Sequence, residues 1–274
     1  MAEMRLVVAG AGGRMGRTLV KAIADSKDFA LAGALEDSRS PLIGWDSGTL
    51  AGLPENGIKL TGDAGPLLAK ADGIIDFTAP VATIAFAALA AKAGKVHIIG
   101  TTGLSAADET KIKEAAKTAV IVKSGNMSLG VNLLAALTKR VAKTLDGSFD
   151  IEILEMHHNQ KVDAPSGTAL STAARVAKAR GDDWQGPDTE NVPGVRGGEA
   201  EGVRVHSVRL PGLVAHQEVI FGGPGQTLTI RHDSMDRESF MPGVLLAIKQ
   251  VATRRGLTVG LEPLLDLPPL DDGA

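Results

Sequence analysis

Four glycines lie between an apolar run and an amphipathic run close to the N-terminus, in the segment VVAGAGGRMGRTLV. The apolar run, residues 5–10, is bounded by glycine, as is typical of a buried parallel strand. In the run that follows, Leu19, Val20 and Ile23 can share one face of a helix. A strand that turns through glycines directly into a helix starts a parallel α/β unit, so this segment restricts the first part of the chain to that class of fold.

The alternation of strand and helix patterns continues through the first half of the chain. Pro80 is well placed in the first turn of a helix that runs to about Ala93. Further apolar runs of strand length are at residues 29–36, 73–78, 95–103 and 119–126. This order predicts an α/β fold with a Rossmann-type doubly wound parallel sheet, and we assign it to a first domain, residues 1–130.

The pattern changes after this domain. A long helix is predicted at residues 128–145, a strand at residues 149–157 and a helix near residues 167–180. Residues 182–202 are rich in Gly, Asp, Glu and Pro and are predicted to form a loop. Three strand-like runs then follow without a helix between them, at residues 203–210, 215–223 and 226–234.

Consecutive strands of this kind predict a second α+β domain, residues 131–240, with a mixed, largely antiparallel sheet. A last helical run at residues 237–254 follows it. We therefore expect residues 241–274 to form a C-terminal helix and tail that return to the first domain.

Composition and charge limit the partners of the chain. The net charge of −3 gives no broad basic field, so we expect no nucleic-acid partner, and any anion must be bound locally. Cysteine is absent, which excludes disulfides, zinc–thiolate sites and thiol nucleophiles and fits a reducing compartment. No apolar run approaches the roughly 20 residues that cross a bilayer, and the N-terminus has no signal-peptide pattern. We expect a cytoplasmic protein without a membrane partner.

The glycine loop has the composition of a pyrophosphate-binding turn, because backbone N–H groups can approach an anion where no Cβ intervenes. Its spacing is G-x-x-G-x-x-G, since Met15 stands where the stricter G-x-G-x-x-G pattern has glycine. Glu36, at the end of the next strand, has the position of a ribose-binding carboxylate. The first domain is therefore predicted to bind a dinucleotide; the alternative is a glycine-rich turn without a ligand.

The choice between NADH and NADPH depends on charges near that carboxylate. Glu36 and Asp37 repel a 2′-phosphate, whereas Arg14, Arg17 and Arg39 could offset the repulsion. The sequence predicts NADH or NADPH as cofactor, with NADH favoured.

Two further loops follow the fourth and fifth predicted strands, at residues 100–102 and 124–127. Ligands of open α/β sheets bind beyond the carboxyl ends of the strands. We expect these loops, with Phe77, to flank the nicotinamide; ordinary connecting loops are the alternative.

A second candidate site is the segment EMHHNQKVDAPSGTAL, residues 155–170. His157 and His158 end a predicted strand, and Lys161 follows. Histidine titrates near neutral pH and can relay a proton, and a lysine ammonium can donate one or neutralise a carboxylate. A structural histidine and a solvated lysine are the alternatives for each residue alone. No third ligand accompanies the histidine pair, so no metal site is predicted.

The turn that follows favours binding of an anion. Pro165 restricts the chain, Ser166 or Thr168 can cap a helix, and Gly167 permits close approach of the backbone. Free N–H groups at a helix start bind carboxylates well. The segment therefore predicts a small substrate that carries carboxylates, and a capped helix without a ligand is the alternative.

Across nearly its whole length the chain resembles the dihydrodipicolinate reductase family. The resemblance rests on GAGGRMG, DFT, GTTG, NMSLGVN, EMHHNQKVDAPSGTA and HSVRLPGLVAHQEVIFGG. It implies NAD(P)H-dependent reduction of 4-hydroxy-tetrahydrodipicolinate to tetrahydrodipicolinate, in lysine and diaminopimelate biosynthesis. It also implies that the second domain binds a small dicarboxylate and that its sheet forms a homotetramer.

The same resemblance implies roles for individual residues. His157 is the proton donor and acceptor and Lys161 the proton donor, while His158, Gly167 and Thr168 hold the substrate carboxylates. The implied cofactor-binding residues are Gly10, Ala11, Gly12, Gly13, Arg14, Met15, Glu36, Gly100, Thr101, Thr102, Ser124, Gly125, Asn126 and Met127. Some family members carry arginine directly after the glutamate, where this chain has Asp37.

Two other functions fit part of these features. One is another NAD(P)-dependent reductase of a small carboxylate, although the lack of cysteine excludes thiol-dependent semialdehyde chemistry. The other is a non-catalytic nucleotide-binding sensor, against which the pair His157 and Lys161 argues.

Overall fold

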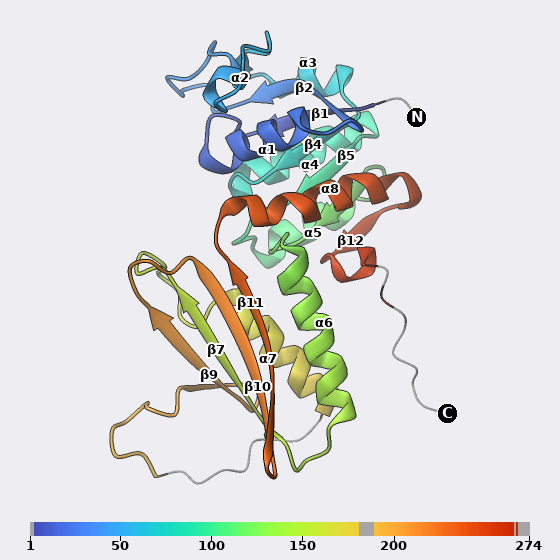
Figure 1. Cartoon of the computed structure of the whole chain (residues 1–274). Helices are drawn as coiled ribbons and strands as arrows, with labels where there is room; N and C mark the ends of the chain where they lie inside the picture. Colours follow the sequence, from blue (N-terminus) through green and yellow to red (C-terminus); the bar gives the residue numbers. More distant parts are fainter. Residues whose placement is uncertain (1–2, 181–188, 266, 268–274) are drawn as a thin grey trace. The chain divides into compact units, whose positions relative to one another are not determined.

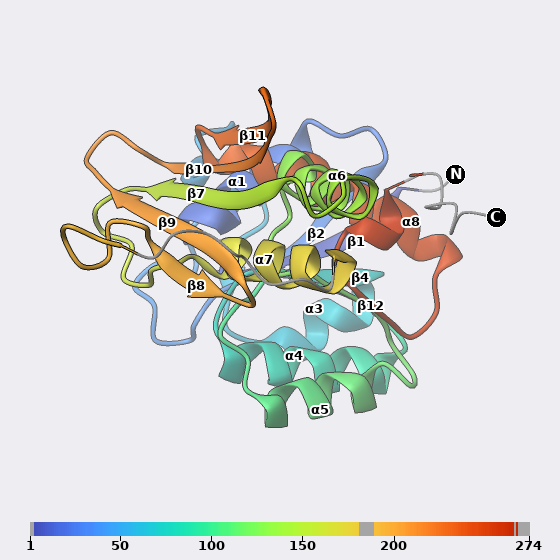
Figure 2. The same ribbon diagram turned by 90° about the horizontal axis from the view of Figure 1, so that it is seen from below.

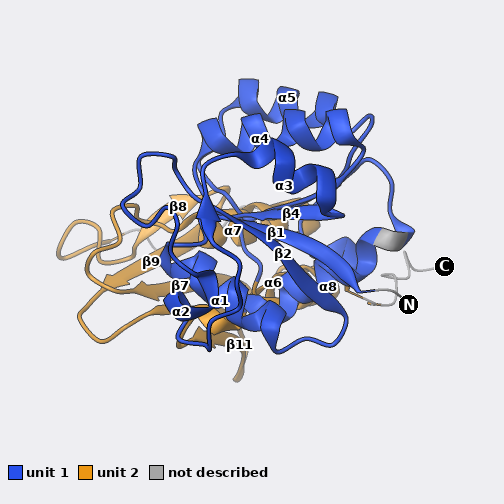
Figure 3. Cartoon of the chain, turned by 90° about the horizontal axis from the view of Figure 1, so that it is seen from above, with its two compact units in different colours: residues 1–127, 240–264 blue, residues 128–239, 265–274 orange. Residues whose placement is uncertain are grey.

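The computed structural model describes residues 3–180, 189–265 and 267. The chain forms two compact units, coloured separately in Figure 3. Unit 1 comprises residues 1–127 and 240–264, and unit 2 comprises residues 128–239 and 265–274. The sequence predicted divisions at residues 130 and 240, whereas the chain divides at 127/128 and 239/240. Most of the predicted tail, residues 266 and 268–274, lies outside the described residues.

Unit 1 is built on a seven-stranded sheet in which every paired strand is parallel, which confirms the doubly wound fold. The strand order is β12-β6-β5-β4-β1-β2-β3. The strands are β1 (Met4–Ala9), β2 (Phe29–Leu35), β3 (Leu60–Thr61), β4 (Gly73–Asp76), β5 (Val96–Ile99), β6 (Val120–Lys123) and β12 (Leu257–Val259). Chain order reverses between β1 and β4, so the loops that follow these two strands leave the sheet side by side.

Helices cover both faces of this sheet (Figures 1 and 3). On one face, α4 packs against α3 and α5; on the other, α1 contacts α8. The helices are α1 (Arg14–Ala24), α2 (Ser47–Leu50), α3 (Ala64–Lys70), α4 (Pro80–Ala93), α5 (Ala106–Ala115) and α8 (Met241–Gln250), with 3₁₀ turns η1 (Arg237–Phe240), η2 (Val251–Thr253) and η3 (Glu262–Leu264). The run predicted as one helix at 237–254 is thus three shorter helical pieces, and residues 240–264 pack with unit 1.

The ends of two helices follow directly from local sequence. Pro80 occupies the first turn of α4, and Gly94 ends the helix in the left-handed conformation. Ser105 and Asp108 form a reciprocal capping box at the start of α5.

Unit 2 contains a five-stranded mixed sheet in the order β11-β10-β7-β9-β8, as the sequence predicted in outline. Its elements are α6 (Leu129–Thr144), β7 (Asp150–His157), α7 (Gly167–Arg180), β8 (Gly198–Ala200), β9 (Val203–Arg209), β10 (Ala215–Gly223) and β11 (Gln226–Ser234). Only β7 and β9 pair in parallel among these strands. The prediction of a loop at residues 182–202 was wrong for β8, which pairs with β9. Residues 181–188 lie outside the described residues.

The core of unit 2 lies between this sheet and its two helices, which run side by side (Figures 1 and 2). Ile151, Ile153 and Glu155 on β7 are buried, whereas Glu152 and the other alternate residues are more exposed. Because alternate strand residues share a face, Glu155 lies in the same row as two core isoleucines. The end of β7 therefore carries a carboxylate into the interior.

No helix among the residues that the structure describes is long and apolar enough to cross a membrane.

The contact between α1 and the glycine loop leaves no room for a side chain at Gly16. A Cβ atom there would lie 2.0 Å from the Gly10 carbonyl oxygen and 2.6 Å from Ala11 Cα. The helix therefore packs directly onto the backbone of the loop.

We predict that Gly16→Ala destabilises the protein by about 1–3 kcal/mol, because α1 must move away from the loop. Gly65, in the first turn of α3, is the matched control, since a Cβ there would meet only Asp63 Oδ1, at 3.6 Å. Gly65→Ala should be neutral or stabilising by up to about 1 kcal/mol. Calorimetric unfolding of both variants tests this, and equal stability of the two would contradict it.

Candidate functional site

The glycine loop brings the predicted cofactor residues Gly10 to Met15 beside Glu36. Gly10 has φ +67°, and its carbonyl accepts a hydrogen bond from Gly13 N at 2.9 Å. Glu36 accepts from Gly12 N at 2.8 Å through Oε2 and from Asp37 N at 3.0 Å through Oε1. The acidic residue at the end of β2 thus lies on the loop after β1, the arrangement in which such a carboxylate reaches a ribose.

The start of α1, at the end of this loop, favours the binding of an anion. Gly13, at the N-cap of α1, provides no side-chain cap, so the first N–H groups of the helix receive no side-chain hydrogen bond from it. A Cβ at Gly12 would lie 2.7 Å from Leu42 Cδ1 and 2.8 Å from Glu36 Oε2. Gly12 is therefore buried beneath Leu42 and Glu36, whereas Gly13 is exposed, so its backbone is accessible to a ligand.

Two of the predicted arginines are engaged by neighbours. Arg39, which is 88% exposed, donates to both Asp37 oxygens, at 3.0 and 2.8 Å. Hydrogen bonds from Arg39 lower the pKa of Asp37 to about 2, so the pair stays ionised. Arg17 donates from Nε to the Gly12 carbonyl at 2.8 Å. The positive charge of Arg39 is thus largely balanced by the aspartate two residues before it.

The loops after β4 and β5 share a buried polar network that the sequence analysis missed. Asp76 and His97 are both fully buried, with Asp76 Oδ2 and His97 Nε2 3.3 Å apart. Asp76 Oδ1 accepts from Thr78 N at 2.9 Å and from Thr78 Oγ1 at 2.5 Å, and Thr78 N also donates to Thr101 Oγ1 at 3.0 Å. Burial raises the pKa of Asp76, but hydrogen bonds from His97, Thr78 and Thr83 outweigh it and hold that pKa below its ordinary value.

The other predicted residues of these loops lie close by. The Phe77 ring covers Gly100, where a Cβ would lie 2.0 Å from Phe77 Cε1. Ser124 N donates to the Ile99 carbonyl at 3.0 Å, and Ser124 Oγ donates to the Asn126 carbonyl at 2.6 Å. The side chain of Met127 is fully buried, so it packs in the core and offers a ligand no side-chain surface.

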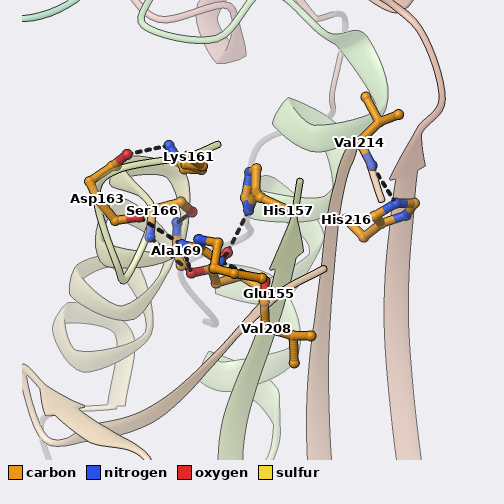
Figure 4. Close-up of polar contacts among 10 residues, drawn as sticks. Glu155, His157, Lys161, Asp163, Ser166, Ala169, Val208, Val214 and His216 are labelled. Carbon is orange, nitrogen blue, oxygen red and sulfur yellow. Dashed lines mark hydrogen bonds and ion pairs between the residues drawn. The ribbon is translucent and has the colours of Figure 1, made fainter. Parts of the chain in front are cut away.

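In unit 2, the His-His-Lys segment is organised around Glu155, whose carboxylate is fully buried (Figure 4). His157 Nδ1 lies 2.5 Å from Glu155 Oε2. Arg209 donates from Nη1 to Oε2 at 2.9 Å and from Nη2 to Oε1 at 2.7 Å. Ser166 N donates to Oε1 at 3.2 Å, and Arg209 Nη2 also donates to the Asp163 carbonyl at 2.7 Å. One carboxylate thus joins β7, β9 and the approach to α7.

The environment of His157 disfavours the imidazolium ion. Burial lowers the pKa of His157 below 6.5, and the charges of Lys161 and Arg209 lower it further, while Glu155 opposes the shift only in part. Burial alone would raise the pKa of Glu155, but hydrogen bonds from Arg209, Ser207 and His157 hold it below its ordinary value. At neutral pH the site therefore combines a neutral imidazole with an ionised glutamate.

Lys161 and His158 lie at the rim of this network. Lys161 Nζ is 2.6 Å from Asp163 Oδ1, and its side chain is 22% exposed. His158 is exposed, and its N–H donates to the Val214 carbonyl at 3.4 Å. Both side chains are therefore accessible from solvent beside the more buried His157.

The Ser-Gly-Thr turn starts α7 as the sequence predicted, and Ser166 rather than Thr168 provides the cap. Ser166 Oγ accepts from Ala169 N at 3.2 Å. Gly167 begins the helix, and a Cβ there would meet no atom within 4 Å. The space over the helix start is thus open to a ligand.

Within the described ranges, no group of three or more His, Asp or Glu residues could hold a metal ion. The roles of Glu155 and Arg209 were not predicted from the sequence. A signal for Glu155 was present, because an acidic residue continues the buried row of an otherwise apolar strand. Nothing in the sequence pattern marked Arg209, which is 54 residues away.

Two models of one protein family match adjoining parts of the chain. The model described as dihydrodipicolinate reductase, N-terminus, matches residues 4–127. The model described as dihydrodipicolinate reductase, C-terminus, matches residues 130–265.

Curated relatives carry a consistent name. A 4-hydroxy-tetrahydrodipicolinate reductase of Rhodopseudomonas palustris (strain BisA53) is 51% identical over 268 residues, which is 97% of each chain. One from Bradyrhizobium sp. (strain ORS 278) is 56% identical over 237 residues, 86% of this chain and 87% of that protein.

Solved structures give the same result. The dipicolinate-bound dihydrodipicolinate reductase of Paenisporosarcina sp. TG-14 superposes with a TM-score of 0.84 at 32% identity, covering 96% of this chain and 100% of that one. A myo-inositol dehydrogenase of Corynebacterium glutamicum, with a TM-score of 0.56 at 14% identity over 93% of this chain and 90% of that one, shares the fold alone. The chain belongs to the dihydrodipicolinate reductase family.

Proposed function

We propose that the chain catalyses NAD(P)H-dependent reduction of 4-hydroxy-tetrahydrodipicolinate to tetrahydrodipicolinate, a step of lysine and diaminopimelate biosynthesis. The observation that carries this proposal within the family is the organisation of His157, Lys161 and the start of α7 around the buried Glu155. A non-catalytic nucleotide sensor has no use for an oriented neutral imidazole beside an ammonium group. A reductase of some other small carboxylate is separated from this one by assay with the ring substrate.

The proton chemistry falls to His157 and Lys161. Loss of the 4-hydroxyl as water needs a base at the C–H bond between C4 and the imine carbon, and an acid at the departing oxygen. Neutral His157 accepts that proton, and the Lys161 ammonium donates a proton to the hydroxyl. Reduction at C4 leaves an enamine that needs a proton at the same carbon, and His157 returns the one that it holds.

The substrate carboxylates are assigned to His158, Gly167 and Thr168. The N-terminus of α7 carries a partial positive charge, and the space over Gly167 is open, because a Cβ there would meet no atom within 4 Å. The dipicolinate held by the solved relative is likewise a six-membered ring that carries two carboxylates. Local donors of this kind serve a dianion even though the chain as a whole is acidic.

The residues of unit 1 fit a dinucleotide. Gly10 to Met15 and the N-terminus of α1 would hold its pyrophosphate, and Glu36 its adenosine ribose. The loops at residues 100–102 and 124–127 would flank the nicotinamide. When bound, NAD(P)H supplies the hydride. NADH is favoured, because the Glu36 carboxylate repels a 2′-phosphate and Asp37 balances the charge of Arg39.

We further propose a homotetramer that assembles through the five-stranded sheet. On the face opposite the core, Leu154, Met156, Val208 and Ile220 are apolar and only partly buried. A partly exposed apolar face of this kind is typical of a subunit interface. A reductase that draws on the metabolic NAD(P)H pool would work in the cytoplasm.

The first test is turnover, followed as nucleotide oxidation with the ring substrate generated in situ. We predict that His157→Asn and Lys161→Met each lower kcat by about 10²–10⁴-fold while nucleotide affinity persists, because the glycine loop belongs to unit 1. His206→Asn and Lys178→Met are matched controls and should stay within about twofold of the parent enzyme.

Absence of turnover in the unmodified protein would contradict the proposed reaction. Loss of nucleotide binding in the His157 or Lys161 variant would instead show that the division of roles between the units is wrong.

The second prediction concerns pH. His157 must be neutral to accept a proton, and its pKa is lowered from 6.5 by burial. As the pH falls through this lowered pKa, the imidazole becomes protonated and kcat/KM declines, so the acid limb should have its midpoint below pH 6.5. A profile of kcat/KM across that range checks the sign. A rate that rises toward acid pH would mean that His157 enters the reaction as an acid.

The third prediction concerns the cofactor. Asp37→Ser should raise the ratio of kcat/KM for NADPH to that for NADH by about tenfold, because Arg39 becomes available to a 2′-phosphate. Asp25→Ser, at the C-terminal end of α1, removes the same charge elsewhere in unit 1 and should leave the ratio unchanged. An unchanged ratio in Asp37→Ser would show that Arg39 does not approach the nucleotide.

A further inference from the structure

We propose that Glu155 is the positioning residue of this site: it fixes His157 in the tautomer with the proton on Nδ1, and it holds the imidazole in register with the first turn of α7. Arg209 acts with it by keeping the carboxylate ionised and immobile. This inference rests on the proposed function, and it assigns roles to Glu155 and Arg209, for which the sequence predicted none.

The tautomer follows from the chemistry of the contact. An ionised carboxylate only accepts hydrogen bonds, so at 2.5 Å from Glu155 Oε2 the Nδ1 atom of His157 must be the donor. The lone pair of the neutral ring is then on Nε2, which has no hydrogen-bond partner among the described residues. Nε2 is therefore the atom that can accept a proton from a substrate.

Arg209 prevents Glu155 from taking the proton itself. Its guanidinium donates one hydrogen bond to each carboxylate oxygen, in the planar fork that this group forms best with a carboxylate. The pKa of Glu155 is thereby held below its ordinary value although burial opposes this. The imidazole keeps its Nδ1 proton and stays oriented.

The same pair fixes the residues around His157. Glu155 Oε1 accepts from Ser166 N, directly before α7, and Arg209 Nη2 donates to the Asp163 carbonyl beside Lys161. The proposed base, proton donor and carboxylate-binding turn are thus connected to one ion pair in the interior. Three charged groups act on His157: Glu155 on its own strand, Arg209 on β9, and Lys161 on the loop between β7 and α7. Asp163 is paired with that lysine.

A second His-Glu-Arg cluster on the same strand provides a matched control. Glu152, on the opposite face of β7, lies 2.8 Å from His206 Nε2 through Oε2 and pairs with Arg196. Its side chain is 26% exposed, whereas that of Glu155 is fully buried. The two clusters have the same residue types, but only the one at Glu155 also holds the turn before α7.

The experiment compares Glu155→Gln, Glu155→Asp and Glu152→Gln in the full-length protein. We expect Glu155→Gln to lower kcat by about 10²-fold, because the amide can donate to Nδ1 and favour the wrong tautomer. Since Glu155 raises the pKa of His157, its replacement should also move the acid limb of kcat/KM to lower pH. Glu155→Asp, which restores the charge, should recover part of the rate and of the shift, and Glu152→Gln should change neither.

Proton–nitrogen NMR spectra of the histidines provide a readout that needs no turnover and no variant. We expect His157 of the unmodified protein to carry its proton on Nδ1, and this result would stand even if the proposed substrate were wrong. A proton on Nε2 would overturn the inference. So would an unshifted acid limb in Glu155→Gln, or an equal shift in Glu152→Gln, because a loss of packing lowers the rate without moving the limb selectively.

Discussion

The arrangement of unit 2 depends on a carboxylate that is removed from water at the end of a strand. An ionised carboxylate in the interior is tolerated only if its charge is paired and its oxygens accept hydrogen bonds. Glu155 meets both conditions through Arg209, Ser166 N and His157 Nδ1. These partners come from β7, β9 and the approach to α7. The contacts that stabilise the buried charge therefore also fix the positions of the residues around it.

Unit 1 also contains a buried carboxylate, which different residues stabilise. Asp76 is the last residue of β4, and its side chain is fully buried, like that of Glu155 near the end of β7. Its partners are His97 on β5 and the hydroxyl groups of Thr78 and Thr101, which belong to the loops beyond the strands. In both units, connecting segments are held by hydrogen bonds to an anion on a strand, which is how a loop can place a functional group accurately.

Periodicity was enough to predict the elements that carry a long, regular pattern, such as β1, α4 and the three strands β9 to β11. It could not predict β3, β8 or β12, because strands of two or three residues have no period and exist only by pairing with a neighbour. The motif residues His157 and Lys161 were visible locally. The pairing of Glu155 with Arg209 was not, because it depends on the parallel register that sets His157 opposite Arg209.

The charge distribution explains how a chain of net charge −3 can serve two anionic ligands. Neither proposed site relies on a long-range positive field, which would be screened beyond about 10 Å. In the proposed sites the start of a helix would meet the anion instead. Asp37 balances the charge of Arg39, and Asp163 balances that of Lys161, so neither cation creates a long-range field. We therefore propose that the residue beside Glu36 influences the choice of nucleotide more than the overall charge does.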